Sequence, residues 1–234
     1  MAWLEPQQVD AFAAAFDVIL TAARAHGRGP ADLVVEVLST CPRPLAAVLD
    51  RYGLGRFRVT QKARVELPGD VYRGDNARPA DWIMTGNHDT PPLAAVVRGF
   101  AGTGEAERRA EYLAGRLAPA GTPREDLAKR LRAEPLAMAE AMMAELFLGP
   151  ARNVLVFWVD LFGLAGVYNR PGVISEENWV MRVPPDFEAE YARSIEDGRA
   201  PSIPRALALA LRARGLDADE EGSALAARLA PVSG

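Results

Sequence analysis

Hydrophobic positions in the first part of the chain recur with two different spacings. Between Pro6 and Ala25 they return at helical spacing, which predicts an amphipathic helix that the segment HGRGP then ends. The next segment, DLVVEVL (32–38), is short, apolar and β-branched, and it predicts a strand. A turn punctuated by prolines and the helical segment RPLAAVLDRYG follow it. The chain therefore begins with a predicted helix, a strand and a second helix.

Three further segments predict strands, namely RFRVTQKA (56–63), DWIMTG (81–86) and NVLVFWVD (153–160). All of them are short and mostly apolar on both faces, which is typical of a buried parallel sheet. Alanine-, arginine- and glutamate-rich sequence from about Thr90 to Leu148 predicts a long helical insertion between the last two strands. Two later segments, PDFEAEYARSI and PRALALALRARG, predict closing helices.

Strands that alternate with helices imply an α/β fold with crossover connections. Four strands are half of what a closed eightfold barrel requires, so the pattern predicts either part of a (β/α) barrel or a small open sheet covered by the helical insertion. Hydrophobic periodicity does not separate these two. We expect a single domain over residues 1–234, with an N-terminal helix in 1–29, the strands in 30–190 and C-terminal helices in 191–234.

The amino-acid composition excludes some classes of binding partner. The chain is 49% hydrophobic and 25% charged, with a net charge of −4, and its basic residues are interspersed with acids, so the basic surface of a nucleic-acid or anionic-membrane binder is missing. The single cysteine, Cys41, excludes an internal disulfide, and the segment MAWLEPQQVD lacks the features of a secretory signal. No run approaches the ~20 apolar residues that span a bilayer. We therefore expect a cytoplasmic protein.

The segment TGNHDT (85–90) places one of the two histidines of the chain beside an acid. Its GNHD motif resembles a turn that helps to hold paired metal ions in calcineurin-like phosphoesterases, but that chemistry needs several His, Asp and Asn ligands from different loops. The other histidine, His26, follows the first predicted helix and has no acidic partner at ligand spacing. One cysteine and two separated histidines also lack the spacing of a zinc site. We therefore expect no metal site.

Polar residues follow the predicted strands at the positions where barrel enzymes collect their reacting groups. Glu36 lies late in DLVVEVL between apolar neighbours, and burial would favour the protonated form that a general acid needs. Asp89 is a candidate second carboxylate for glycoside cleavage, and His88 is a candidate donor to sugar hydroxyls. Each residue also has a structural interpretation, in which Glu36 pairs with an arginine and His88-Asp89 caps the helix that TPPL begins.

The order of the motifs resembles the C-terminal part of the 4-α-glucanotransferases, also called amylomaltases or disproportionating enzymes, of glycoside hydrolase family 77. The segment LVVEVLSTCPRPLAAVLDRYGLGRFRVTQ resembles the family's AEDLG-like strand end, proline, helix, RFGLPG-like turn and next strand. TGNHDT resembles its THD turn, VFWVDLFGL its late D-L-L-G-L strand, and VYNRPGVISEENWVMRVPPDF its N-x-P-G-T…NW…R-x-P segment. The likeness runs from about residue 30 to 190, and four motifs in order make it specific.

The resemblance implies the second half of a catalytic barrel that transfers α-1,4-glucan segments with retention of configuration, without a metal or organic cofactor. Glu36 would be the general acid/base, Asp89 the aspartate that stabilises the transition state, and His88 its sugar-contacting neighbour. In such proteins the loops that carry Asn169 and the pair Asn178-Trp179 line the glucan groove. Trp179 would stack on a pyranose ring, although a buried core position is an equal alternative from the sequence.

The chain departs from the family at the nucleophile. The family's nucleophilic aspartate lies on the strand before the acid/base strand, in an R-I-D-H-like motif, and no such motif precedes Glu36. Asp10 and Asp17 lie on the first predicted helix and have no strand-end context. We therefore predict an enzyme part that needs a partner chain or self-association to supply the missing half-barrel. The alternatives are a non-catalytic α-glucan-binding or regulatory remnant and a structural domain related by descent alone.

Overall fold

The computed structural model describes residues 5–37, 41–119 and 121–229, and its strands form one parallel sheet. The strands are β1 at Val34–Val35, β2 at Gly55–Val59, β3 at Trp82–Met84 and β4 at Asn153–Val154. All neighbours are parallel and their order in the sheet, β1-β2-β3-β4, is their order in the chain. Successive strands of a (β/α) barrel are arranged in the same way. The α/β prediction is therefore confirmed, and the sheet is consistent with part of a barrel.

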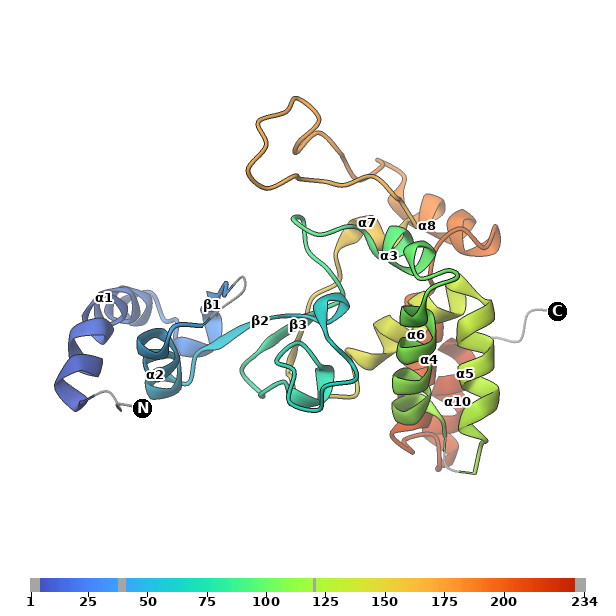
Figure 1. Cartoon of the computed structure of the whole chain (residues 1–234), viewed down its shortest axis with the longest axis horizontal. Helices are drawn as coiled ribbons and strands as arrows, with labels where there is room; N and C mark the ends of the chain where they lie inside the picture. Colours follow the sequence, from blue (N-terminus) through green and yellow to red (C-terminus); the bar gives the residue numbers. More distant parts are fainter. Residues whose placement is uncertain (1–4, 38–40, 120, 230–234) are drawn as a thin grey trace.

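Helices connect the strands and follow the sheet (Figure 1). Those before the insertion are α1 (Pro6–Ala25) and α2 (Arg43–Tyr52). The insertion between β3 and β4 contains α3 (Leu93–Gly99), α4 (Gly104–Leu117), α5 (Arg124–Ala133) and α6 (Pro135–Glu145). After β4 come α7 (Trp158–Leu161), α8 (Phe187–Glu196), α9 (Ile203–Ala213) and α10 (Glu220–Leu229). The predicted first helix, helical insertion and closing helices are thus confirmed.

The strand predictions were right in place and wrong in length. Of the predicted strand 32–38, residue 38 lies outside the described residues, and within 32–37 only Val34–Val35 pair. Within 153–160 only Asn153–Val154 pair before the chain turns into α7. Both segments are edges of the sheet, with a partner strand on one side only, so pairing ends where the neighbouring strand no longer runs alongside. A sequence window shows the apolar run but not the length of the partner.

The main apolar core lies in the helical insertion. Helix α6 contacts α3, α4, α5 and α9, and its residues 137–145 are all buried. Alanine and methionine dominate this stretch, so neighbouring helices approach closely and the flexible methionines fill the remaining gaps. Figure 1 shows this helical body at one end of an elongated molecule, with α1 and α2 at the other and the sheet between them. No helix in the described ranges is long and apolar enough to cross a bilayer.

Candidate functional site

The turn after β3, residues 85–92, is held in shape by its own polar side chains. The Asn87 side-chain oxygen accepts a hydrogen bond from the backbone N–H of Asp89 (3.1 Å). The Thr90 hydroxyl accepts one from the backbone N–H of Asn87 (2.9 Å) and donates one to the Asn87 carbonyl (3.0 Å). Asn87 and Thr90 are buried, whereas the side chains of His88 and Asp89 are 38% and 25% exposed. The turn thus presents its imidazole and its carboxylate to solvent.

A second segment, from the loop between α7 and α8, binds the exposed end of this turn. The Asn169 side-chain amide donates a hydrogen bond of 2.5 Å to Asp89 Oδ1, and its backbone N–H donates one of 3.1 Å to the His88 carbonyl. The His88 Nε2 lies 3.4 Å from the same Asp89 oxygen. Three of the residues that the sequence resemblance singled out therefore meet, although Asn169 lies 80 residues from Asp89 in the chain.

Trp179 completes this cluster from the far side of the same loop. Its ring centroid lies 5.1 Å from that of His88 and 5.3 Å from that of Tyr168, and its backbone N–H donates to the Tyr168 carbonyl at 3.0 Å. Its backbone is left-handed, with φ of +64°, a conformation that a bulky residue seldom adopts and that marks a constrained position. Since Trp179 is 50% exposed, the alternative of a buried core tryptophan is wrong.

Asn178, the neighbour of Trp179, forms its hydrogen bonds within its own loop. Its side-chain oxygen accepts from the backbone N–H of Arg170 (3.1 Å), and its amide donates to the Val173 carbonyl (2.8 Å). Both polar groups are therefore engaged inside the loop. In this structure Asn178 shapes the loop that carries Trp179 rather than presenting a free amide.

Glu36 follows β1 directly, at the same edge of the sheet as the turn after β3, but its environment differs from the expected one. The side chain is exposed, so the burial that would have favoured its protonated form is absent. Among the described residues no hydrogen bond or ion pair reaches Glu36, so the pairing with an arginine is not observed either. Strand β2 lies between β1 and β3, which places these two strands about 10 Å apart. No bond joins Glu36 to Asp89.

A third carboxylate at this edge, Asp160 of α7, was missed as a site residue. It is buried, and its two oxygens accept hydrogen bonds from the backbone N–H of Leu93 (2.7 Å) and the hydroxyl of Thr85 (3.0 Å). Burial raises the pKa of Asp160, while these two hydrogen bonds oppose the shift. Because α3 begins at Leu93, the carboxylate at its N-terminus is that of Asp160, and the prediction that His88-Asp89 caps this helix is wrong.

Gln61, at the end of β2, supports the turn from the opposite side. Its backbone N–H donates to the Thr85 carbonyl (3.1 Å), and its side-chain amide donates to the Pro91 carbonyl (3.2 Å). A Cβ added at Gly86 would lie 3.0 Å from Gln61 Oε1 and 2.7 Å from Thr90 Oγ1, so a larger residue there would have to displace these side chains. Spacing along the chain gives no sign of this contact, because Gln61 lies in a short 3-10 turn after β2, more than 20 residues before Gly86.

The carboxylates of α1 are engaged far from the site, as their lack of strand-end context predicted. Asp10 forms an ion pair with Arg51, and Asp17 accepts a hydrogen bond from the Tyr52 hydroxyl. His26 lies at the C-cap of α1. In the part of the chain that the structure describes, no three His, Cys, Asp or Glu residues are grouped as metal ligands would be.

Known protein-family models and curated proteins give no match to this sequence. Solved structures do match: the amylomaltase of Corynebacterium glutamicum has a TM-score of 0.51 and 18% identity, over 86% of this chain and 30% of that one. The amylomaltase of Streptococcus agalactiae in complex with acarbose has a TM-score of 0.48 and 13% identity, over 72% of this chain and 32% of that one. The chain therefore spans about a third of the length of these amylomaltases. The likeness to the Corynebacterium glutamicum structure shows a fold similar to part of an amylomaltase, as the sequence resemblance predicted.

Proposed function

We propose that this chain carries part of an α-1,4-glucan transfer site, in which the turn after β3 and the loop between α7 and α8 bind a sugar. The observation that supports this most directly is the cluster of Asp89, His88, Asn169 and Trp179. It combines a carboxylate, an imidazole and an amide with a half-exposed indole ring, which is the set of groups that binds hydroxyls and the apolar face of a pyranose.

In this proposal Asp89 stabilises the positive charge that develops on the sugar ring, and His88 and Asn169 donate to hydroxyls beside it. Glu36 is the general acid/base, which protonates the leaving oxygen and then deprotonates the 4-hydroxyl of the acceptor glucan. Its exposure in this chain means that a glucan, or another part of the barrel, would have to cover it. Asn178 acts indirectly by holding the loop of Trp179.

Retention also needs a nucleophile about 5 Å from the acid/base. In the six residues that follow each strand, the described carboxylates are Glu36, Asp89 and Asp160 only. Asp160 is only 1% exposed and its oxygens point to the Thr85 hydroxyl and the Leu93 N–H, so a sugar does not reach it in this structure. We therefore propose that the nucleophile and the remaining strands come from elsewhere, from a partner chain or a second copy that pairs with the free edges of β1 and β4.

A non-catalytic α-glucan-binding protein is the second candidate. The exposure of Glu36 and the lack of a bond between it and Asp89 favour this candidate, because the sugar cluster is assembled while the acid/base stands apart. A site that only binds needs Asp89, His88, Asn169 and Trp179 but has no use for Glu36.

Incubation of the purified chain with maltotriose, followed by chromatography, tests the proposal. A transferase yields glucose together with longer maltodextrins, and Glu36→Gln abolishes both. If the folded chain binds maltotriose without forming products, it is either the non-catalytic protein or an enzyme part that needs a partner chain, and the appearance of Glu36-dependent products on addition of a partner that carries the missing half-barrel identifies the enzyme part. If it neither binds nor converts maltotriose, the proposed function is wrong.

A further inference from the structure

A separate cavity lies between α2 and the first half of β2, and it shares no residue with the proposed sugar cluster. Its volume is about 240 Å³. We call it the arginine pocket, and it is lined by Cys41, Ala46, Leu49, Asp50, Arg56, Arg58 and Arg78. Three guanidinium groups thus line a cavity whose other walls are largely apolar.

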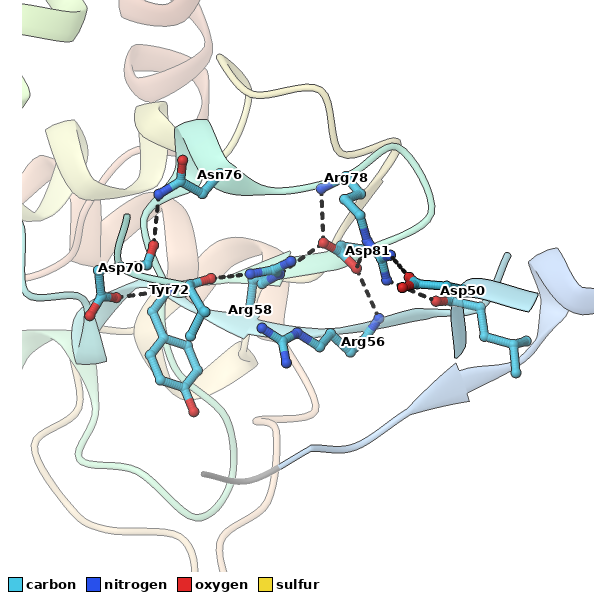
Figure 2. Close-up of polar contacts among 10 residues, drawn as sticks. Asp50, Arg56, Arg58, Asp70, Tyr72, Asn76, Arg78 and Asp81 are labelled. Atoms are coloured by element: carbon cyan, nitrogen blue, oxygen red, sulfur yellow. Dashed lines mark hydrogen bonds and ion pairs between the residues drawn. The ribbon is translucent and has the colours of Figure 1, made fainter. Parts of the chain in front are cut away.

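The fold brings these arginines together through one buried carboxylate (Figure 2). Arg56 and Arg58 alternate on β2 and so lie on the same face of the sheet. Asp81, fully buried just before β3, accepts from the backbone N–H of Arg56 (3.0 Å), from Arg58 Nε (2.8 Å) and from the backbone N–H of Arg78 (2.8 Å). The charge of Asp81 is therefore compensated by Arg58.

Two of the three guanidinium groups have further partners, and the third has none in the described residues. Arg58 donates to the Val71 carbonyl, and Arg78 forms an ion pair with Asp50 (2.5 Å). No described residue accepts a hydrogen bond from the Arg56 guanidinium or forms an ion pair with it, although Arg56 is partly buried. Three positive charges therefore face two negative ones across the pocket, and one positive charge is uncompensated.

The pKa of Arg58 is consistent with an excess of positive charge around the pocket. Burial lowers its pKa, and Asp81 opposes that shift. The neighbouring positive charges of Arg56 and Arg78 lower the pKa of Arg58 further, because each of them repels its charged form. An anion between them would relieve this repulsion, and the apolar wall formed by Leu49 and Ala46 would strengthen its attraction by keeping water away.

We propose that the arginine pocket binds a small phosphoryl oxyanion, either inorganic phosphate or the phosphoryl group of a small metabolite. The planar guanidinium fork binds phosphate oxygens in pairs, and an ion with four oxygens can engage several arginines at once where a carboxylate has only two oxygens. The cavity is smaller than the ~300–1,000 Å³ typical of pockets for drug-sized ligands, so a phosphoryl group fits it better than a nucleotide. This inference does not depend on the proposed glucan function.

Isothermal titration of the whole chain with inorganic phosphate, in a phosphate-free buffer of low ionic strength, tests the proposal. Arg56→Gln is the informative variant because the Arg56 side chain has no described partner whose loss would disturb folding. We expect it to weaken phosphate binding by about tenfold or more, since hydrogen bonds to charged groups are worth that much. Arg124→Gln, at an exposed arginine of α5, makes the same charge change elsewhere and should leave binding unaltered.

A parallel titration with glucose 6-phosphate distinguishes the two sources of the phosphoryl group. Equal affinity for both probes assigns the pocket to the free ion, and tighter binding of glucose 6-phosphate assigns it to a metabolite. The proposal is overturned if the wild-type chain binds neither probe. It is also overturned if Arg56→Gln binds as well as wild type, or if Arg124→Gln weakens binding to the same extent. Urea unfolding of each variant checks that the fold is retained.

Discussion

The helical insertion and the sheet differ in how much of their apolar surface they cover. Helix α6 has nine consecutive buried residues, whereas the edge regions of the sheet leave Val34 38% and Leu155 36% exposed. The chain exposes 13296 Å², against about 10,300 Å² for a compact monomer of 25.2 kDa. The insertion therefore contains its own core, while the sheet has apolar surface that this chain does not cover. This is the difference expected if the sheet is part of a larger barrel.

Two carboxylates of the helical body and the carboxylate of Glu36 at the edge of the sheet differ in the same way, since the first two are covered by the chain and Glu36 is not. In the helical body the buried Glu145 accepts hydrogen bonds from the Tyr112 hydroxyl and the Gly74 N–H, and the buried Glu140 accepts from Ser202 and Arg205. Near the strand ends, Glu36 is exposed and without a described partner. These two buried carboxylates are thus satisfied within the chain, whereas the carboxylate of Glu36 faces outward.

The largest expected effect is a difference in stability between substitutions in the helical body and substitutions at the edge of the sheet. Met143 is fully buried in α6, so Met143→Ala should lower the free energy of unfolding by about 2–5 kcal/mol. Val34→Ala, on the open edge of the sheet, removes little buried surface and should cost less than about 1 kcal/mol. Urea unfolding measures both. Equal losses would show that the sheet is covered as completely as the helical body.

Removal of the Asp160 carboxylate tests how firmly the turn after β3 is anchored. Asp160→Ala leaves the Leu93 N–H and the Thr85 hydroxyl without their partner in a buried site, and we expect a loss of about 2–3 kcal/mol. Chemical denaturation measures the loss. A variant as stable as wild type would mean that these two hydrogen bonds do not hold the turn.

Asp160→Asn tests the sign of the pH dependence. The pKa of Asp160 is higher in the folded protein than the ~3.9 of an unfolded chain, so the folded state is favoured most when the carboxyl is protonated, below pH ~3.9. That contribution to the free energy of unfolding is lost as the pH rises through the pKa of the folded state. The stability of wild type relative to Asp160→Asn should therefore fall as the pH rises from about 4. Unfolding of both proteins at a series of pH values measures this difference. A difference that is constant with pH would contradict the assignment.

A smaller effect is expected at Gly86, where an added methyl group would meet Thr90 and Gln61. We expect Gly86→Ala to destabilise the chain by about 1–2 kcal/mol and to displace the turn. Gly99→Ala is the matched control, because a methyl group there would have no neighbour within 4 Å. Thermal unfolding of both variants checks the pair, and equal effects would show that the contact with Gln61 does not constrain the turn.

The sequence predicted the elements of this fold well because hydrophobic spacing is a local property. The first helix has the predicted bounds, and each predicted strand overlaps a real one. Strand length and the exposure of Glu36 depend on neighbours along the sheet, which no window of the sequence contains. The roles of Asp160 and Gln61 in holding the turn after β3 could not be predicted for the same reason, because their hydrogen-bond partners lie on other elements.

The candidate site was predictable only through its resemblance to a family. Residue type alone favoured a helix cap for His88-Asp89 over a sugar site, and the spacing gave no sign that Asn169 would meet Asp89. The arginine pocket had no sequence signal beyond the alternation of Arg56 and Arg58 on a strand. It depends on Asp81, which accepts hydrogen bonds from two residues of β2 and from Arg78 in the segment before β3.

Calorimetric titration of maltotriose into the chain tests the central claim, that the turn after β3 and the loop of Trp179 form a sugar site. Wild type should bind, Trp179→Ala should bind about tenfold more weakly because the exposed ring is lost, and Val180→Ala, at an exposed neighbour in the same loop, should bind as wild type does. A folded wild-type chain that does not bind, or a Trp179→Ala variant with unchanged affinity, would contradict the claim.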